Sequence, residues 1–190
     1  MTIHDLERLA NSLVADGKGI LAADESVATL TRRFDALRIP STEQSRRRYR
    51  EMLFTTPGAA AFISGVIMYD ETICQKGSIS IGDGRPSSTC VGVNAHQASV
   101  PEVAAATLSL ATAHLNAINR LPGPRPWTIS FSYGRALQDR ALEGWHGRDE
   151  NVHTGQQALY HQARCNSAAS LGTFTDDMEM TESVHGTNVR

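Results

Sequence analysis

The stretch GKGILAADES, residues 17–26, decides the fold. It holds a short apolar run, Ile20–Ala23, between glycines and a pair of acids, and this pattern is typical of a strand buried in a parallel sheet. Asp24, Glu25 and Ser26 follow the run directly. Because α/β proteins place their ligand-binding groups where parallel strands end, we expect chemistry at this point of the chain.

Two further segments have the composition of buried strands. Residues 61–69, AFISGVIMY, follow a Pro-Gly break, and residues 127–132, WTISFS, follow a Pro-Gly-Pro break. Between them, residues 77–99 are rich in Ser, Gly, Asp, Pro and Thr, which predicts a loop or linker with at most one weak strand near residues 90–93.

Amphipathic spacing and cap residues predict helices around these strands. We expect them over about residues 3–15, 27–37, 42–54, 102–120, 135–143 and 151–170. The polar segment 173–190 has no such spacing and is expected to be poorly ordered. Strands that alternate with helices predict an α/β architecture with parallel pairing.

The composition excludes several classes of protein. With 190 residues, 41% apolar and 20% charged, the chain is typical of one globular domain. A net charge of −2 gives no reason to expect a nucleic-acid or membrane partner, and no stretch approaches the roughly 20 apolar residues of a membrane span. The amphipathic start and three unpaired cysteines favour the cytoplasm. No histidine or cysteine motif indicates a metal, and no glycine motif indicates a nucleotide cofactor.

The residues after the first strand allow two interpretations. Asp24 is a candidate catalytic carboxylate, and it is equally a candidate N-cap for the following helix. Ser26 and Thr29 could donate hydroxyl groups to a phosphate at that helix N-terminus, although capping is favoured on the local pattern alone.

A similar arrangement follows the third strand. In the sequence SYGR, residues 132–135, Gly134 permits close backbone approach and Arg135 offers a planar fork suited to phosphate. A surface arginine beside a turn glycine is favoured on the pattern alone. Two strand ends of this kind nevertheless suggest a substrate with two phosphates. The arginines of residues 46–50, RRRYR, could contact a phosphate backbone, but a solvated helix face is favoured.

Two parts of the chain resemble the class I fructose-bisphosphate aldolases. Residues 1–76 match through segments 17–26, 46–50 and 65–76, and residues 111–170 match through segments 115–120, 126–127, 131–137, 143–145 and 150–152. The resemblance implies a TIM (β/α)8-barrel, here incomplete, with about three recognisable strands and flanking helices. It divides the chain into an N-terminal barrel segment (1–76), an unmatched linker and helix start (77–110), a C-terminal barrel segment (111–172) and a flexible tail (173–190).

The resemblance also implies roles for individual residues. Asp24 corresponds to the carboxylate beside a lysine that forms a Schiff base, without a metal or cofactor, during cleavage of fructose 1,6-bisphosphate. The expected phosphate-binding residues are, for one phosphate, Ser26, Thr29 and Arg33, and for the other, Ser132, Gly134 and Arg135. Arg32 stands where the family usually has lysine. The partner is then a small sugar phosphate, and full-length relatives are homo-oligomers.

The chain departs from the family in its centre. Between Lys76 and about Ala111 the family has most of its barrel, including the Schiff-base lysine, the paired acids and a Ser-Gly-Gly phosphate loop. In this chain, 34 residues of unrelated sequence replace them. Lys18 and Lys76 are the lysines of the whole sequence, and the family's C-terminal tyrosine is missing. We therefore expect a lyase by family whose own catalysis is impaired. The alternative is a non-catalytic remnant with weak sugar-phosphate binding.

Overall fold

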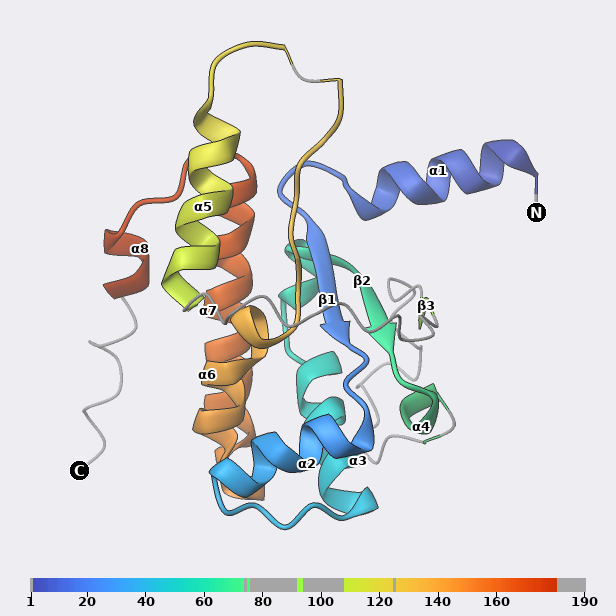
Figure 1. Cartoon of the computed structure of the whole chain (residues 1–190), viewed down its shortest axis with the longest axis vertical. Coiled ribbons are helices and arrows are strands. Elements are labelled where there is room, and N and C mark those ends of the chain that lie inside the picture. Colours follow the sequence, from blue (N-terminus) through green and yellow to red (C-terminus); the bar gives the residue numbers. More distant parts are fainter. Residues whose placement is uncertain (1, 74, 76–91, 94–107, 125, 181–190) are drawn as a thin grey trace.

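A four-stranded parallel sheet organises the molecule (Figure 1). The computed structural model describes residues 2–73, 75, 92–93, 108–124 and 126–180. The strands are β1 (Gly19–Ala23), β2 (Ile63–Met68), β3 (Gly92–Val93) and β4 (Ser132–Tyr133), in the order β3-β2-β1-β4. Every neighbouring pair is parallel, which confirms the predicted architecture. The weak strand expected near residues 90–93 is β3.

The register of the sheet aligns the ends of its two central strands. Ala23 of β1 pairs with Met68 of β2, so both strands end at one level. The third predicted strand is shorter than expected, because residues 126 and 127 form a bend and Trp127 is exposed. Within the predicted third strand, only β4 pairs with β1, and Ser132 lies opposite Ile20. The prediction that this strand begins at Trp127 was therefore wrong.

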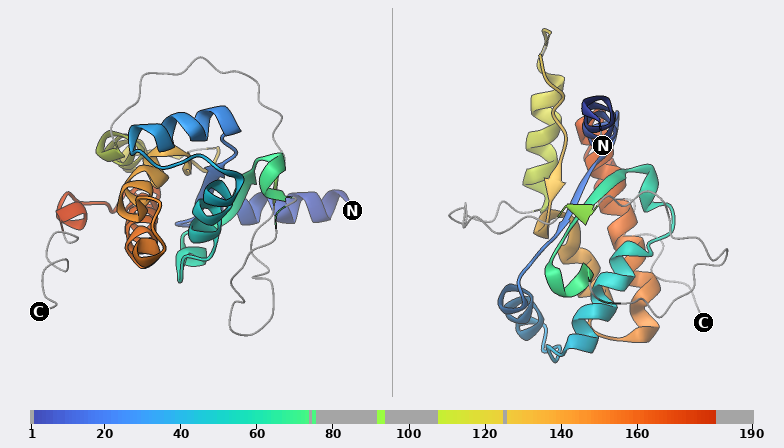
Figure 2. Two further views of the ribbon diagram at one scale, coloured as in Figure 1. Left: turned by 90° about the horizontal axis from the view of Figure 1, so that it is seen from below. Right: turned by 90° about the vertical axis from the view of Figure 1, so that its right-hand side faces the viewer.

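The predicted helices form close to their expected limits (Figure 2). They are α1 (Ile3–Leu13), α2 (Val27–Ala36), α3 (Glu43–Phe54), α5 (Leu108–Arg120), α6 (Arg135–Trp145) and α7 (Val152–Ser170). Residues 102–107 of the predicted fifth helix lie outside the described residues. Shorter helical turns not expected from the sequence are η1 (Ala59–Ala61), α4 (Asp70–Ile73), η2 (Asp149–Asn151) and α8 (Asp177–Met180).

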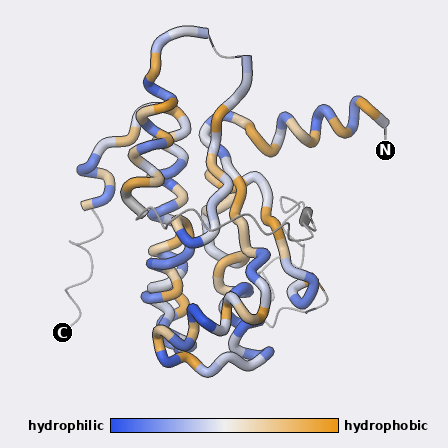
Figure 3. The backbone as a smooth tube through the Cα atoms, in the orientation of Figure 1, coloured by the Kyte–Doolittle hydropathy of each residue, from blue (hydrophilic) through white to orange (hydrophobic). Residues whose placement is uncertain are grey.

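An aromatic cluster joins α2, α3 and α6 in the core. Phe34, Tyr49 and Trp145 are buried, with ring centroids 5.6 to 6.0 Å apart. Along α1, hydrophobic and hydrophilic residues alternate (Figure 3). That helix begins at a Thr2 N-cap but has no buried residue, and it projects from the rest of the molecule (Figure 1).

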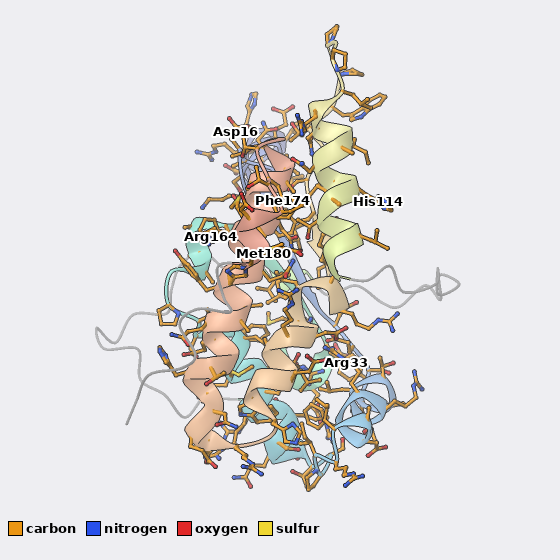
Figure 4. All side chains as sticks on the ribbon, turned by 90° about the vertical axis from the view of Figure 1, so that its left-hand side faces the viewer. Asp16, Arg33, His114, Arg164, Phe174 and Met180 are labelled. Atoms are coloured by element: carbon orange, nitrogen blue, oxygen red, sulfur yellow. The ribbon has the colours of Figure 1, made fainter. Side chains whose placement is uncertain are left out.

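The start of the predicted tail is anchored to the helices. Phe174 is buried beside α5 and α7 (Figure 4), its backbone N–H donates to Asn116 Oδ1 at 3.2 Å, and Asn116 Nδ2 donates back to its carbonyl at 3.1 Å. The expectation of poor order therefore does not describe residues 173–180, because one aromatic side chain fixes them to the core. Residues 181–190 lie outside the described part of the chain.

Candidate functional site

The structure brings the two candidate strand ends together. β1 and β4 are adjacent and parallel, with Leu21 opposite Tyr133. The segments that follow them, Asp24–Ser26 and Gly134–Arg135, consequently leave the same edge of the sheet. Gly134 lies close to β1, since a Cβ atom at this position would stand 3.4 Å from the carbonyl oxygen of Ala22. This edge is the candidate site.

Ser26, and not Asp24, is the N-cap of α2. Its Oγ accepts a hydrogen bond from the backbone N–H of Thr29 at 3.3 Å and donates to Thr29 Oγ1 at 3.2 Å. The suggestion that Asp24 caps the helix was therefore wrong. The Asp24 side chain is half-buried and has no hydrogen bond or ion pair with any residue that the structure describes. A carboxylate so placed at a strand end is available to a ligand.

Arg33 lies inside a buried polar network instead of at the opening of the site. Its Nη1 donates to Glu25 Oε1 at 2.6 Å and to Gln138 Oε1 at 3.1 Å, and its Nη2 donates to Asp139 Oδ1 at 3.0 Å and to the Tyr49 hydroxyl at 3.3 Å. The guanidinium thus connects α2 with α3 and α6 (Figure 4). These contacts use much of its hydrogen-bonding capacity within the protein.

Burial controls the ionisation of this network. It raises the pKa of Glu25 above its usual range, and the nearby charges of Arg33 and Arg50 oppose that shift. Burial likewise raises the pKa of Tyr49. The Tyr49 hydroxyl donates to Gln138 Oε1 at 3.0 Å, while Gln138 Nε2 donates to the carbonyl oxygen of Ala22 at 2.5 Å. The end of β1 is therefore held by a side chain from α6.

The arginine-rich segment is not a solvated face. Arg46 and Arg50 are buried, and both bind Glu71 of α4: Arg46 Nη2 at 2.5 Å and Arg50 Nη1 at 3.0 Å. Arg50 Nη2 also donates to the backbone carbonyl of Glu25 at 2.8 Å. The hydrogen bond from Arg46 is the largest cause that lowers the pKa of Glu71. The solvated-face prediction was wrong because four-residue spacing turns both side chains toward the same acid.

Sequence reasoning missed Gln138 and Glu71, which support the site. Gln138 has no exposed surface and touches β1, Arg33 and Tyr49 at once. Its position in the first turn of α6, next to the candidate phosphate residues, was the available signal. Glu71 offered a signal as well, since it follows β2 as Asp24 follows β1.

A sequence model described as fructose-bisphosphate aldolase class-I matches residues 5–88 and 102–189. The chain belongs to this family.

Curated relatives agree with that assignment. The cytosolic fructose-bisphosphate aldolase 4 of Arabidopsis thaliana is 24% identical over 340 positions, with 95% of this chain and 86% of the relative covered. A probable class 1 aldolase of Xylella fastidiosa is 26% identical, with 92% and 99% covered. The first of these alignments exceeds the 190 residues of the chain by 150 positions, so this aldolase is shorter than its full-length relatives by a large internal segment.

A solved structure shows the same fold. The fructose-bisphosphate aldolase of Plasmodium falciparum, crystallised with TRAP and a small molecule inhibitor, superposes with a TM-score of 0.74 at 21% identity, covering 90% of this chain and 95% of that one. The aldolase chain described here is thus an incomplete TIM (β/α)8-barrel.

Lys18 lies at the amino end of the sheet, away from the candidate site. It precedes β1, and its Nζ donates to the carbonyl oxygen of Ala60 at 2.9 Å. It is the one lysine among the residues that the structure describes, since Lys76 falls outside them. The described part of the candidate site therefore contains Asp24, Ser26 and Arg135 but no lysine.

Two features are absent from the residues that the structure describes. No three histidine, cysteine, aspartate or glutamate side chains there are grouped as a metal site. Within the same residues, no helix has the length and apolar character needed to cross a membrane.

Proposed function

We propose that this chain is a catalytically impaired class I aldolase, which binds sugar phosphates but does not cleave fructose 1,6-bisphosphate. The position of Lys18 carries the proposal. A Schiff base requires an amine beside the substrate carbonyl, at the carboxyl end of the strands.

The distance along β1 separates this amine from the site. Asp24 follows Lys18 by six positions, which corresponds to about 20 Å of extended chain. The four-carbon stem of a lysine does not span that length. The contact between Lys18 Nζ and Ala60 also directs the ammonium group to the amino end of the sheet.

Three features support binding of a sugar phosphate. The N-terminus of α2, at Ser26 and Thr29, presents backbone N–H groups and a helix dipole that favour an anion. Gly134 and the exposed Arg135 begin α6 at the neighbouring strand end, where an arginine fork suits a second phosphate. Asp24 precedes Ser26 by two positions and could accept a hydrogen bond from a substrate hydroxyl. Ser132, also exposed, borders the same edge.

Trapping with borohydride tests the catalytic part of the proposal. The chain is incubated with dihydroxyacetone phosphate, reduced with borohydride and analysed by mass spectrometry, beside a full-length class I aldolase as positive control. We expect an adduct on the control and none on this chain. A stable adduct on Lys18 or Lys76 would show that a Schiff base forms and would overturn the proposal.

A binding measurement tests the other part. Titration with dihydroxyacetone phosphate, followed by the amide signals of residues 24–30 and 132–138 in NMR, should shift both sets. Shifts in neither set would remove the sugar-phosphate role. We place this function in the cytoplasm because relatives of the chain include a cytosolic and a cytoplasmic aldolase.

A further inference from the structure

The backbone of β4 has an edge that no described strand pairs with. The N–H of Ile20 donates to the carbonyl oxygen of Phe131 at 2.8 Å, and in a parallel ladder alternate residues of a strand face the same neighbour. Phe131 and Tyr133 therefore face β1, whereas the N–H and C=O of Ser132 point away from it. Among the described strands, β4 ends the sheet on this side and β3 ends it on the other.

Exposed apolar side chains lie beside the β4 edge. The Tyr133 hydroxyl donates to the carbonyl oxygen of Ala111 at 3.0 Å, so α5 runs next to β4. On α5 and directly after it, Leu110 is 47% exposed, Ile118 41% and Leu121 62%. Leu110 and Leu121 are eleven residues apart, about three helical turns, and lie on one side of the helix. This α5 stripe (Leu110, Ile118, Leu121) is a surface of the kind that another protein covers.

The opposite edge has a matching feature. The short helix α4 connects β2 to β3 and ends with Ile73, which is 49% exposed. In a parallel barrel the helices cover the sheet in strand order, so the next helix position beyond α4 is vacant in the described chain. A helix that precedes the next strand would fill it, and α5 precedes β4.

We propose that two copies of this chain associate edge to edge, with β4 of each copy beside β3 of the other, to close an eight-stranded parallel barrel. A closed barrel of this family has eight strands, and the chain supplies four in unbroken parallel order. A two-fold rotation about the barrel axis preserves the direction of every strand. In each copy, the backbone N–H and C=O of Ser132 would then pair with β3 of the other copy. None of the four sheet edges, two from each copy, would remain open.

The same rotation covers the apolar surfaces. It brings the α5 stripe of one copy next to α4 of the other, where Ile73 is exposed. At each of two junctions, α5 and the edge of β4 from one copy would face α4 and the edge of β3 from the other. Each copy would take part in both junctions, so the two contact areas add. The rotation also places both candidate sites at one barrel mouth, because all strands end there.

Light scattering after gel filtration tests the association. We expect a mass twice the 20.6 kDa of one chain. Leu110→Glu, which places a charge on the α5 stripe, should give the single-chain mass with an unchanged circular dichroism spectrum. The control Gln157→Glu, at an exposed position of α7, should remain dimeric. The proposal is overturned if the wild-type chain still has the single-chain mass at a concentration about 100 times that needed for detection. It is also overturned if the Leu110→Glu variant remains a dimer.

A cysteine pair separates barrel closure from any other dimer. In a Cys74→Ser, Cys90→Ser background, Ser132→Cys is combined with Val93→Cys. Residues 93 and 132 lie at opposite ends of the four-stranded sheet, about 14 Å apart, which is too far for a disulfide within one chain. Oxidation should therefore yield a covalent dimer on a non-reducing gel, and either single cysteine variant should yield less. Equal yields from single and double variants overturn the edge-to-edge arrangement. This outcome is independent of whether the chain binds sugar phosphate.

Discussion

Glu25 and Arg33 form a 2.6 Å ion pair in which only 13% and 11% of the two side chains are exposed. Glu25 precedes α2 and Arg33 lies near its end, so the pair spans the length of the helix on its inner side. The arginine that family resemblance places at a phosphate site is thus also a structural link between three helices.

Replacing Arg33 should affect stability more than binding. Arg33→Gln leaves the buried Glu25 carboxylate without its cation, and loss of one partner from a buried pair costs about 3 kcal/mol. Urea denaturation should show that decrease in the free energy of unfolding. Arg32→Gln, at the exposed neighbouring position, is the control and should change it by less than about 0.5 kcal/mol. Equal stability of the two variants would contradict the structural role.

Arg135 should show the opposite behaviour. Arg135→Gln removes an exposed guanidinium from the candidate site, and charged hydrogen bonds contribute about 1.5–3 kcal/mol, so the Kd for dihydroxyacetone phosphate should rise roughly tenfold or more. Its free energy of unfolding should stay close to that of the wild type. Arg148→Gln, beyond the other end of α6, should leave the Kd unchanged. An unchanged Kd for Arg135→Gln would remove this residue from the site.

Glu71 should make stability depend on acid. Because hydrogen bonds from Arg46 lower its pKa in the folded state below the usual 4.5, the folded protein binds fewer protons than the unfolded chain in this range. Its stabilising contribution is complete above about pH 4.5 and is lost as the pH falls through the lowered pKa. Wild type and Glu71→Gln should therefore differ by about 3 kcal/mol near pH 7 and much less near pH 3.

An exposed carboxylate serves as the control for Glu71. Glu150→Gln should follow the wild type at every pH, since Glu150 lies on the surface in η2. A stability difference for Glu71→Gln that stays constant down to about pH 3 would mean that the carboxylate does not titrate with folding.

The elements of the fold could be predicted because local patterns encode them. Ile20–Ala23 is apolar between glycines and acids, and β1 occupies that position. The limits of β4 could not be predicted. Tryptophan is a residue type common in strands, but Trp127 lies in a bend outside the sheet. Only the partner strand decides where pairing begins.

The candidate site could be predicted only in part, for a similar reason. Adjacency of the two strand ends followed from the parallel architecture. The partners of Arg33, Arg46 and Arg50 did not, because they come from residues up to 106 positions away and depend on how the helices pack. An arginine run with the same sequence would be solvated if no acid stood at the position of Glu71.

The packing of α7 against its neighbours allows a sharp test with two glycines. A Cβ atom at Gly155 would stand 2.9 Å from the backbone carbonyl oxygen of Ala141 and 2.4 Å from Met52 Sδ, whereas one at Gly144 would meet Thr154 Cγ2 at 3.3 Å. Both glycines lie in helices, so alanine gains up to about 1 kcal/mol of helix propensity at either position. The difference between the two variants therefore reports the close approach of the helices.

Gly155→Ala should lower the free energy of unfolding by about 1–3 kcal/mol, because a backbone oxygen cannot move aside as a flexible side chain can. Gly144→Ala should stay within about 1 kcal/mol of the wild type. Thermal and urea denaturation of the two variants give the comparison. If Gly155→Ala is as stable as Gly144→Ala, α6 and α7 do not approach as closely as the structure shows, and α6 would then no longer hold Gln138 against the end of β1.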